Sequence, residues 1–159
     1  MAKITMITAI NQTLHQQMQK NDRIMVIGED VGKEGGVFRA TEGLQLKYGI
    51  DRVVDSPLSE NGIIGTAIGL AINGMRPVTE IEFSGFMYYA FHQLKSNASK
   101  IRNRTRGALS CPLIVRAPYG SGVRALEEHS ESTEALYVHS PGLNVVIPST
   151  PYEAKGLLT

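Results

Sequence analysis

The uncharged stretch from Ile63 to Ile72 constrains the fold more than any other part of this sequence. Its isoleucines and alanines recur every four residues, which is the spacing of a helix. Ser59 precedes this helix as a candidate N-cap, and Asn73 followed by Gly74 forms a stop signal. Because a helix this apolar cannot present a wide face to water, we expect the rest of the chain to pack around it.

A single carboxylate, Glu60, stands in the first turn of this apolar helix. The helix N-terminus favours its anion by about 0.3–1 kcal/mol, whereas complete burial disfavours the anion by more than that. In a closed site, Glu60 therefore becomes a proton donor and acceptor near neutral pH. The alternative is an exposed glutamate that only complements the helix dipole. The helix also contains Gly62, Gly65 and Gly69, which indicates that another backbone or a flat ligand approaches it closely.

Short apolar strands alternate with helices along the rest of the chain. We expect strands at residues 24–27, 52–55, 77–83, 112–117 and 143–147, and further helices at 5–19, 41–48, 86–102, 131–138 and from 151 onward. This alternation predicts an α/β fold, with three α/β/α layers and a mainly parallel sheet covered on both faces. The length of 159 residues suits one domain, and we expect that domain (1–159) to be incomplete at its C-terminal end because the last helix has no cap.

Charge and cysteine content exclude several classes of protein. A net charge of +1 gives no electrostatic basis for binding nucleic acid or an anionic membrane, and no apolar run is long enough to span a bilayer. The single cysteine, Cys111, excludes an intramolecular disulfide and a cysteine-based zinc site. The histidines lack metal-ligand spacing, so we expect no metal site in this chain. The N-terminus has no signal- or transit-peptide character, so the expected compartment is the cytoplasm.

Two further stretches allow more than one interpretation. The glycine-rich loop 33–38 could cradle a phosphate, but Glu29, Asp30 and Glu34 would repel an anion, so a structural turn is favoured. The end of the 86–102 helix carries a cationic cluster that either complements the helix C-terminus or contacts an acidic partner. The cluster consists of Lys100, Arg102, Arg104 and Arg106.

Several motifs, taken in order, carry a resemblance to a known family. They are Gly28-Glu-Asp-Val-Gly32 with Gly35-Gly-Val-Phe38, Pro57-Leu-Ser-Glu60 with its Gly-Ile-Ile-Gly helix, Glu80-Ile-Glu-Phe83, Pro112-Leu-Ile-Val-Arg116, His129-Ser, Pro141-Gly-Leu and Val146-Ile-Pro-Ser-Thr-Pro-Tyr-Glu-Ala-Lys-Gly156. From about Ile4 to Thr159, the chain resembles the β subunit of the thiamine-diphosphate-dependent E1 component of 2-oxo acid dehydrogenase complexes.

The resemblance implies roles for five residues. In the family, a glutamate at the position of Glu60 hydrogen-bonds N1′ of the cofactor's aminopyrimidine and promotes loss of the thiazolium C2 proton. Leu58 matches a residue whose backbone carbonyl holds the exocyclic amine, and Phe86 matches the aromatic that covers the pyrimidine. Glu82 matches a position where relatives often carry glutamine, and an ionised glutamate can only accept a hydrogen bond. His129 matches an active-site histidine near the substrate carboxylate, although its acidic neighbours also allow an exposed loop histidine.

The resemblance also implies an activity. This is oxidative decarboxylation of a 2-oxo acid, pyruvate or branched-chain, with acyl transfer to a lipoyl-bearing E2. It implies thiamine diphosphate, with magnesium held by an E1 α subunit in an α2β2 heterotetramer. The likeness covers the N-terminal transketolase-like pyrimidine-binding domain and lacks the C-terminal transketolase-like domain. Alternatives are the β subunit of acetoin dehydrogenase, the pyrimidine domain of a transketolase or deoxyxylulose phosphate synthase, and a non-catalytic domain that binds an α subunit.

Because the resemblance gives this chain only the pyrimidine half of a cofactor site, we expect the purified 159-residue chain to bind thiamine diphosphate weakly or not at all. Isothermal titration calorimetry checks this expectation. Micromolar affinity in the absence of an α subunit would contradict it.

Overall fold

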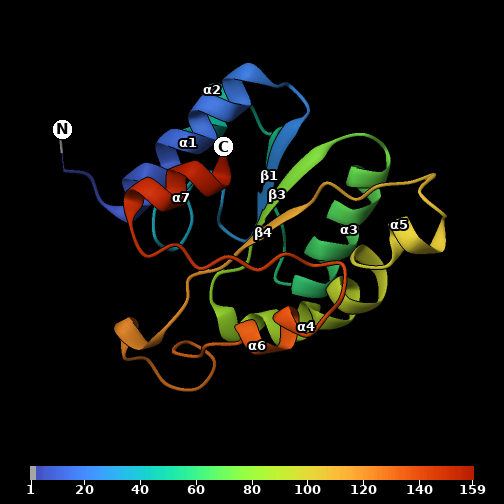
Figure 1. Cartoon of the computed structure of the whole chain (residues 1–159). Coiled ribbons are helices and arrows are strands. Elements are labelled where there is room, and N and C mark those ends of the chain that lie inside the picture. The colour runs from blue at the N-terminus through green and yellow to red at the C-terminus, as the bar shows by residue number, and fades with distance from the viewer. Residues whose placement is uncertain (1–2) are drawn as a thin grey trace.

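The computed structural model describes residues 3–159 and has a four-stranded sheet between two layers of helices (Figure 1). All strand pairs are parallel, in the order β2-β1-β3-β4. The predicted three-layer α/β/α fold with a parallel sheet is therefore confirmed. The strands are β1 (Ile24–Gly28), β2 (Val53–Asp55), β3 (Arg76–Glu80) and β4 (Ile114–Arg116). The helices are α1 (Met6–Lys20), α2 (Leu44–Tyr48), α3 (Glu60–Ile72), α4 (Met87–His92), α5 (Ile101–Arg104), α6 (Glu134–Val138) and α7 (Pro151–Leu158).

The central strand β1 shows why both faces of the sheet are apolar. Its side chains alternate, so that Met25 and Ile27 join the core beneath α3 and α4, while Val26 joins the core beneath α1. Helices α1 and α7 lie side by side on one face of the sheet, and α3, α4 and α6 lie on the other (Figure 1). A parallel sheet covered in this way needs apolar strands on both faces, which the sequence of β1 provides.

Helix α3 forms as the sequence predicts. The Ser59 side chain accepts a hydrogen bond from the Gly62 N–H at 3.2 Å and caps the helix. Ile63, Ile64 and Ile68 are buried against the sheet and α4. This packing places the N-terminus of α3, and Glu60 with it, at the carboxyl end of the sheet.

Three predicted elements differ from the structure. Strand β3 ends at Glu80 rather than residue 83, because the chain turns at Ser84, whose N–H donates to the Pro118 carbonyl at 2.9 Å. The predicted helix 86–102 is divided into α4, a π-helical segment (Gln93–Ala98) and α5. Residues 143–147 form no strand, although Leu143 and Val145 pack on the core.

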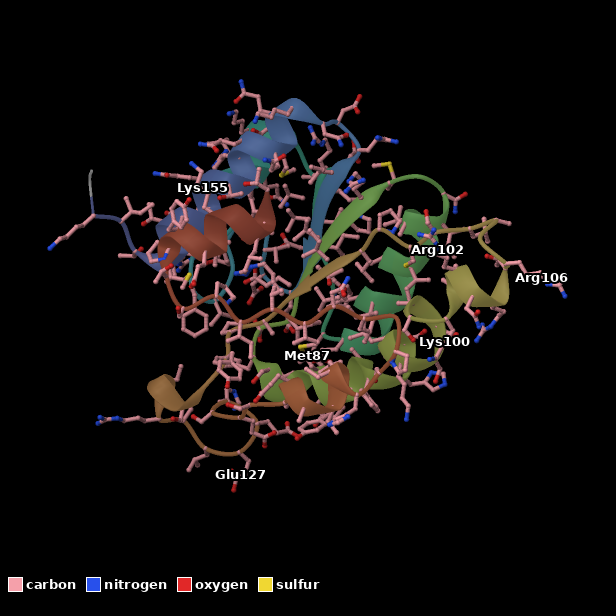
Figure 2. All side chains as sticks on the ribbon, in the orientation of Figure 1. Met87, Lys100, Arg102, Arg106, Glu127 and Lys155 are labelled. Carbon is pink, nitrogen blue, oxygen red and sulfur yellow. The ribbon has the colours of Figure 1, made fainter. Side chains whose placement is uncertain are left out.

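The cationic cluster at α5 contacts carbonyl groups of the chain itself. Arg104 donates to the Ser96 carbonyl at 2.8 Å, and Lys100 donates to the Pro141 carbonyl at 3.2 Å. Arg102 and Arg106 are exposed around the α5 end of the molecule (Figure 2). The contact of Arg104 supports the simpler interpretation, in which cations complement helical carbonyls.

A buried ion pair joins β3 to β4 at their carboxyl ends. Arg116 donates to a Glu80 carboxylate oxygen at 2.7 Å, and the Glu80 side chain is only 2% exposed. Burial raises the pKa of Glu80, and the charge of Arg116 opposes this effect. Burial likewise lowers the pKa of Arg116, and Glu80 opposes it. Each charge is therefore tolerated inside the fold because the other is present.

Residues 3–159 contain no helix with the length and apolar character needed to cross a membrane.

We expect Arg116→Met to destabilise the chain by about 3–5 kcal/mol, because it leaves the Glu80 carboxylate buried without a counter-charge. The double variant Glu80→Leu/Arg116→Met should recover most of that loss, since it removes both charges. Urea unfolding followed by circular dichroism measures both values. Equal destabilisation of the single and double variants would show that packing, rather than charge, accounts for the effect.

Candidate functional site

The carboxyl ends of the parallel strands bring the candidate residues to one edge of the sheet. From β1 the chain passes to β2 on one side, and β3 and β4 lie on the other side. A topological switch point therefore lies between β1 and β3, where parallel α/β sheets bind their ligands. Glu29 follows β1, Glu82 follows β3, and Glu60 begins α3 after β2. The switch point is consequently surrounded by carboxylates.

Glu60 is buried, with 9% of its surface exposed. The alternative of an exposed glutamate at the helix start is therefore wrong. Its carboxyl interacts with two others at the switch point. Burial raises the pKa of Glu29, and the charges of Asp30 and Glu60 raise it further.

Glu82 has a strongly raised pKa. Burial raises its pKa to about 7, with further contributions from Glu29, Asp30, Glu80 and Glu60. The site thus holds a glutamate that keeps its proton up to neutral pH. A protonated carboxyl can donate a hydrogen bond, which removes the objection that a glutamate at this position could only accept one.

A cluster of four rings stands beside the carboxylates. The His129 ring lies 4.6 Å from the Phe83 ring and 4.9 Å from the Phe86 ring, measured between centroids. Phe83 also contacts Phe86 at 5.6 Å and Phe38 at 5.7 Å, both edge to face. We call Phe38, Phe83, Phe86 and His129 the aromatic cluster. His129 is therefore half-buried among rings rather than an exposed loop residue.

The loop that carries His129 is attached to the turn after β3. The Ser84 hydroxyl donates to the Glu131 carbonyl, and the Tyr89 hydroxyl contacts both carboxylate oxygens of Glu128, at 2.9 and 3.1 Å. A Cβ at Gly85 would overlap the backbone of Glu128, so only glycine allows this approach. These contacts fix the backbone on either side of His129.

Within that loop, the Nδ1 atom of His129 lies 2.9 Å from the Glu127 carbonyl oxygen. The Glu127 side chain points away from the body of the molecule (Figure 2). Glu127, two residues before His129, therefore faces solvent, while the imidazole of His129 faces the aromatic cluster.

The sequence-predicted residues divide into two groups. Glu60 lies close enough to Glu82 for its charge to raise the pKa of Glu82, and the Phe86 ring contacts the His129 ring in the aromatic cluster. Leu58 lies in the turn between β2 and α3 with a side chain that is 74% exposed, so a contact from this position would come from its backbone.

Sequence reasoning missed the contribution of Phe38, Phe83 and Glu29 to the site. All three directly follow strands or lie in the loop after β1, and their position at the carboxyl edge was the signal that could have identified them. Among residues 3–159, no group of three or more His, Cys, Asp or Glu side chains is arranged to hold a metal ion.

Comparison with known proteins gives close sequence relatives over the whole chain. The chain is 54% identical over 158 residues to the pyruvate dehydrogenase E1 component subunit beta of Acholeplasma laidlawii, covering 99% of this chain and 48% of that protein. It is 49% identical to the 2-oxoisovalerate dehydrogenase subunit beta of Bacillus subtilis, with the same coverage of 99% and 48%. It is 52% identical over 155 residues to the 3-methyl-2-oxobutanoate dehydrogenase subunit beta of Mycobacterium tuberculosis, covering 98% and 44%. The chain spans about half the length of these curated relatives.

Comparison with solved structures supports the fold. A chain described as a split gene transketolase, inactive beta4 tetramer, superposes with a TM-score of 0.74 at 19% sequence identity, covering 99% of this chain and 47% of that chain. The family model described as the pyrimidine binding domain of transketolase matches residues 2–159. The protein is therefore a member of the transketolase pyrimidine-binding domain family.

Proposed function

We propose that this chain is the pyrimidine-binding domain of an E1 β subunit that works with an α subunit. The complete enzyme would decarboxylate a 2-oxo acid oxidatively and transfer the acyl group to a lipoyl-bearing E2. The observation that carries this proposal is the buried Glu60 at the switch point, together with Glu82, whose pKa burial raises to about 7, and the aromatic cluster. A purely structural interaction domain would have no use for this arrangement, because buried carboxylates cost stability.

The residues at the site fit an aminopyrimidine ring. Such a ring is flat and presents nitrogen donors and acceptors at its edge. The Phe86 ring can cover one face, Glu60 can bind a ring nitrogen, and the exocyclic amine can donate to the Leu58 carbonyl. Glu82 can donate from its protonated carboxyl to a further ring nitrogen. Thiamine diphosphate, when bound, supplies the electron sink that decarboxylation of a 2-oxo acid requires.

Glu60 has the role of holding and moving a proton at its carboxylate oxygens. Glu60 is buried in the first turn of α3, and such burial strengthens a hydrogen bond that its carboxyl makes to a bound ligand. The negative charge of Glu60 adds to the burial that raises the pKa values of Glu29 and Glu82. This electrostatic coupling supports a site in which a proton is retained and can be passed to a bound ligand.

His129 would contact the substrate through its imidazole. When Nδ1 donates to the Glu127 carbonyl, Nε2 is the nitrogen left to contact a ligand. The rings of Phe83 and Phe86 hold the imidazole in place. A histidine oriented in this way can bind a carboxylate or exchange a proton with a reaction intermediate.

The proposal divides the complete site between chains. Residues 1–159 would form the N-terminal domain, followed in the full-length protein by a C-terminal transketolase-like domain. The α subunit would hold the diphosphate and magnesium in an α2β2 heterotetramer. The acidic surroundings of Glu29 and Asp30 agree with this division, because they would repel a diphosphate.

We expect Glu60→Gln, in the full-length protein combined with its α subunit, to lower turnover about 10²–10⁴-fold while cofactor affinity falls modestly. Glutamine keeps the size and hydrogen-bonding capacity of the side chain but cannot hold the proton. Exchange of the thiazolium C2 proton for deuterium, followed by NMR after an acid quench, tests this step directly.

Two matched variants make that result specific. Glu42→Gln changes an exposed glutamate and should leave C2 exchange unchanged. His129→Ala should keep C2 exchange but slow acyl transfer to the lipoyl group. Normal C2 exchange in Glu60→Gln would refute the role of Glu60, even if overall activity were low.

The raised pKa of Glu82 predicts a pH-dependent stability. In the unfolded chain this carboxyl ionises near 4.5, whereas in the folded chain it keeps its proton to about 7. Unfolding therefore releases a proton within this window, and the stability that Glu82 contributes is lost as pH rises from about 4.5 to about 7. Glu82→Gln should remove this dependence and be more stable than the unmodified chain at pH 8, by urea unfolding. If the free energy of unfolding depended on pH equally in both proteins, the raised pKa assigned to Glu82 would be contradicted.

A further inference from the structure

Glu128, the residue immediately before His129, has a backbone conformation that is unusual for a residue with a side chain. Its φ is 68°, in the left-handed region that glycine adopts more readily than other residues. The His129 N–H donates to the Leu126 carbonyl at 3.2 Å, so residues 126–129 form a turn in which Glu128 is the third residue. A positive φ at the third position of a turn is normally provided by glycine or asparagine. A contact from outside the turn is therefore required to hold Glu128 in this conformation.

The Tyr89 hydroxyl provides such a contact. It donates to both carboxylate oxygens of Glu128, at 2.9 and 3.1 Å. This hydrogen bond and the charge of Glu128 raise the pKa of Tyr89, so the hydroxyl keeps its proton and remains a donor. Within residues 3–159, the Glu128 carboxylate accepts a hydrogen bond from no other side chain. Tyr89 alone therefore anchors this side chain to the body of the domain.

The helix that carries Tyr89 also carries one of the rings that contact His129. Phe86 directly precedes α4, and Tyr89 follows Phe86 by three residues, a spacing that places both side chains on one face of a helix. The Phe86 and His129 ring centroids lie 4.9 Å apart. The same face of α4 thus contacts both the imidazole and the residue before it. The hydrogen bond from Tyr89 consequently fixes the turn where the imidazole reaches the aromatic cluster.

Other hydrogen bonds of this loop do not replace the contact from Tyr89. The Ser84 hydroxyl donates to the Glu131 carbonyl, and the Ser130 hydroxyl donates to the Ala125 carbonyl at 3.0 Å. Neither bond involves Glu128. Without the Tyr89 hydroxyl, the loop would stay attached, but Glu128 would be free to leave the positive φ. That change would rotate the peptide group that precedes His129.

We propose that Tyr89 is a positioning residue for His129, acting through Glu128, whose left-handed backbone it holds so that the imidazole faces the aromatic cluster. The consequence for catalysis rests on the proposed function, in which His129 contacts the substrate. The consequence for the orientation of His129 is independent of that function, because it follows from contacts within this chain.

The test begins with Tyr89→Phe, which removes the hydroxyl and keeps the ring. In the 159-residue chain, the NMR signal of the His129 Cε1 proton, assigned by comparison with His129→Ala, reports the ring currents of Phe83 and Phe86. We expect this signal to move in Tyr89→Phe toward the position of an exposed histidine.

The second readout is catalytic and uses the full-length protein combined with its α subunit. Acyl transfer from pyruvate or 3-methyl-2-oxobutanoate to a lipoyl domain should slow about 10- to 100-fold in Tyr89→Phe, because a misplacement of about 1 Å can cost that much. Exchange of the thiazolium C2 proton should stay normal, since it depends on Glu60. A general loss of folding would lower both rates together.

Substitutions at Glu128 show whether Tyr89 acts through this turn. Glu128→Ala removes the carboxylate but keeps the Cβ that disfavours a positive φ, so it should have the same effect as Tyr89→Phe. Glu128→Gly removes the Cβ as well and can adopt the turn without a hydrogen bond. It should therefore restore both readouts when it is combined with Tyr89→Phe. A defect caused only by altered packing around the Tyr89 ring would not be restored by Glu128→Gly.

Tyr152→Phe is the matched control. It removes the hydroxyl from a tyrosine that is 89% exposed on α7, which lies on the opposite face of the sheet from α4 (Figure 1). It should leave the His129 signal in place and both rates within about 2-fold of the unmodified protein.

The outcomes separate this inference from the function on which it rests. An unchanged His129 signal or normal acyl transfer in Tyr89→Phe would overturn the inference, and so would a defect that Glu128→Gly does not restore. If the unmodified complex transferred no acyl group from any 2-oxo acid, the proposed function would be contradicted. In that case, the NMR comparison of Tyr89→Phe with the double variant still decides whether Tyr89 positions His129.

Discussion

The ion pair between Glu80 and Arg116 is the interaction on which the carboxyl edge of the sheet depends. The two residues are partners in the register of β3 and β4, and they lie at the last paired position of both strands. The loop after β1 also packs on Glu80, because a Cβ at Gly28 or Gly36 would come within 2.7 Å of its atoms. A buried charge pair tolerates little displacement, so it fixes three of the four strand ends from which the candidate site is built.

The same ion pair sets the electrostatics of the site. Arg116 pairs with Glu80. No positively charged side chain is among the groups that shift the pKa values of Glu29 and Glu82. Burial and the nearby carboxylates raise the pKa of Glu82 to about 7. Such a site favours ligands rich in nitrogen and disfavours anions. This preference is consistent with a proposal in which the ring of the cofactor binds here and its diphosphate binds to another subunit.

Local sequence signals were sufficient to predict the parts of the fold that depend on residues close together in the sequence. The cap at Ser59, the apolar repeat of α3 and the apolar run of β1 all act within a few residues, and each appears as predicted. The stretch 143–147 has a strand-like pattern, but a pattern cannot show whether a hydrogen-bonding neighbour is within reach. The approach of His129 to the aromatic cluster could not be predicted for a similar reason. His129 meets Phe83 and Phe86 only because Gly85 lets a distant loop approach the turn after β3.

The position of β1 at the centre of the sheet has a consequence for how the protein is made. Val26 pairs on one side with Val53 and on the other with Val78, so β1 has both of its neighbours only after β3 has been synthesised. Until β3 is synthesised, an apolar strand remains with an open edge, and such edges recruit strands from other chains. Contacts so distant in sequence also form slowly. Yield in a cell therefore depends on the speed of translation and on chaperones that occupy this edge, in addition to the stability of the finished fold.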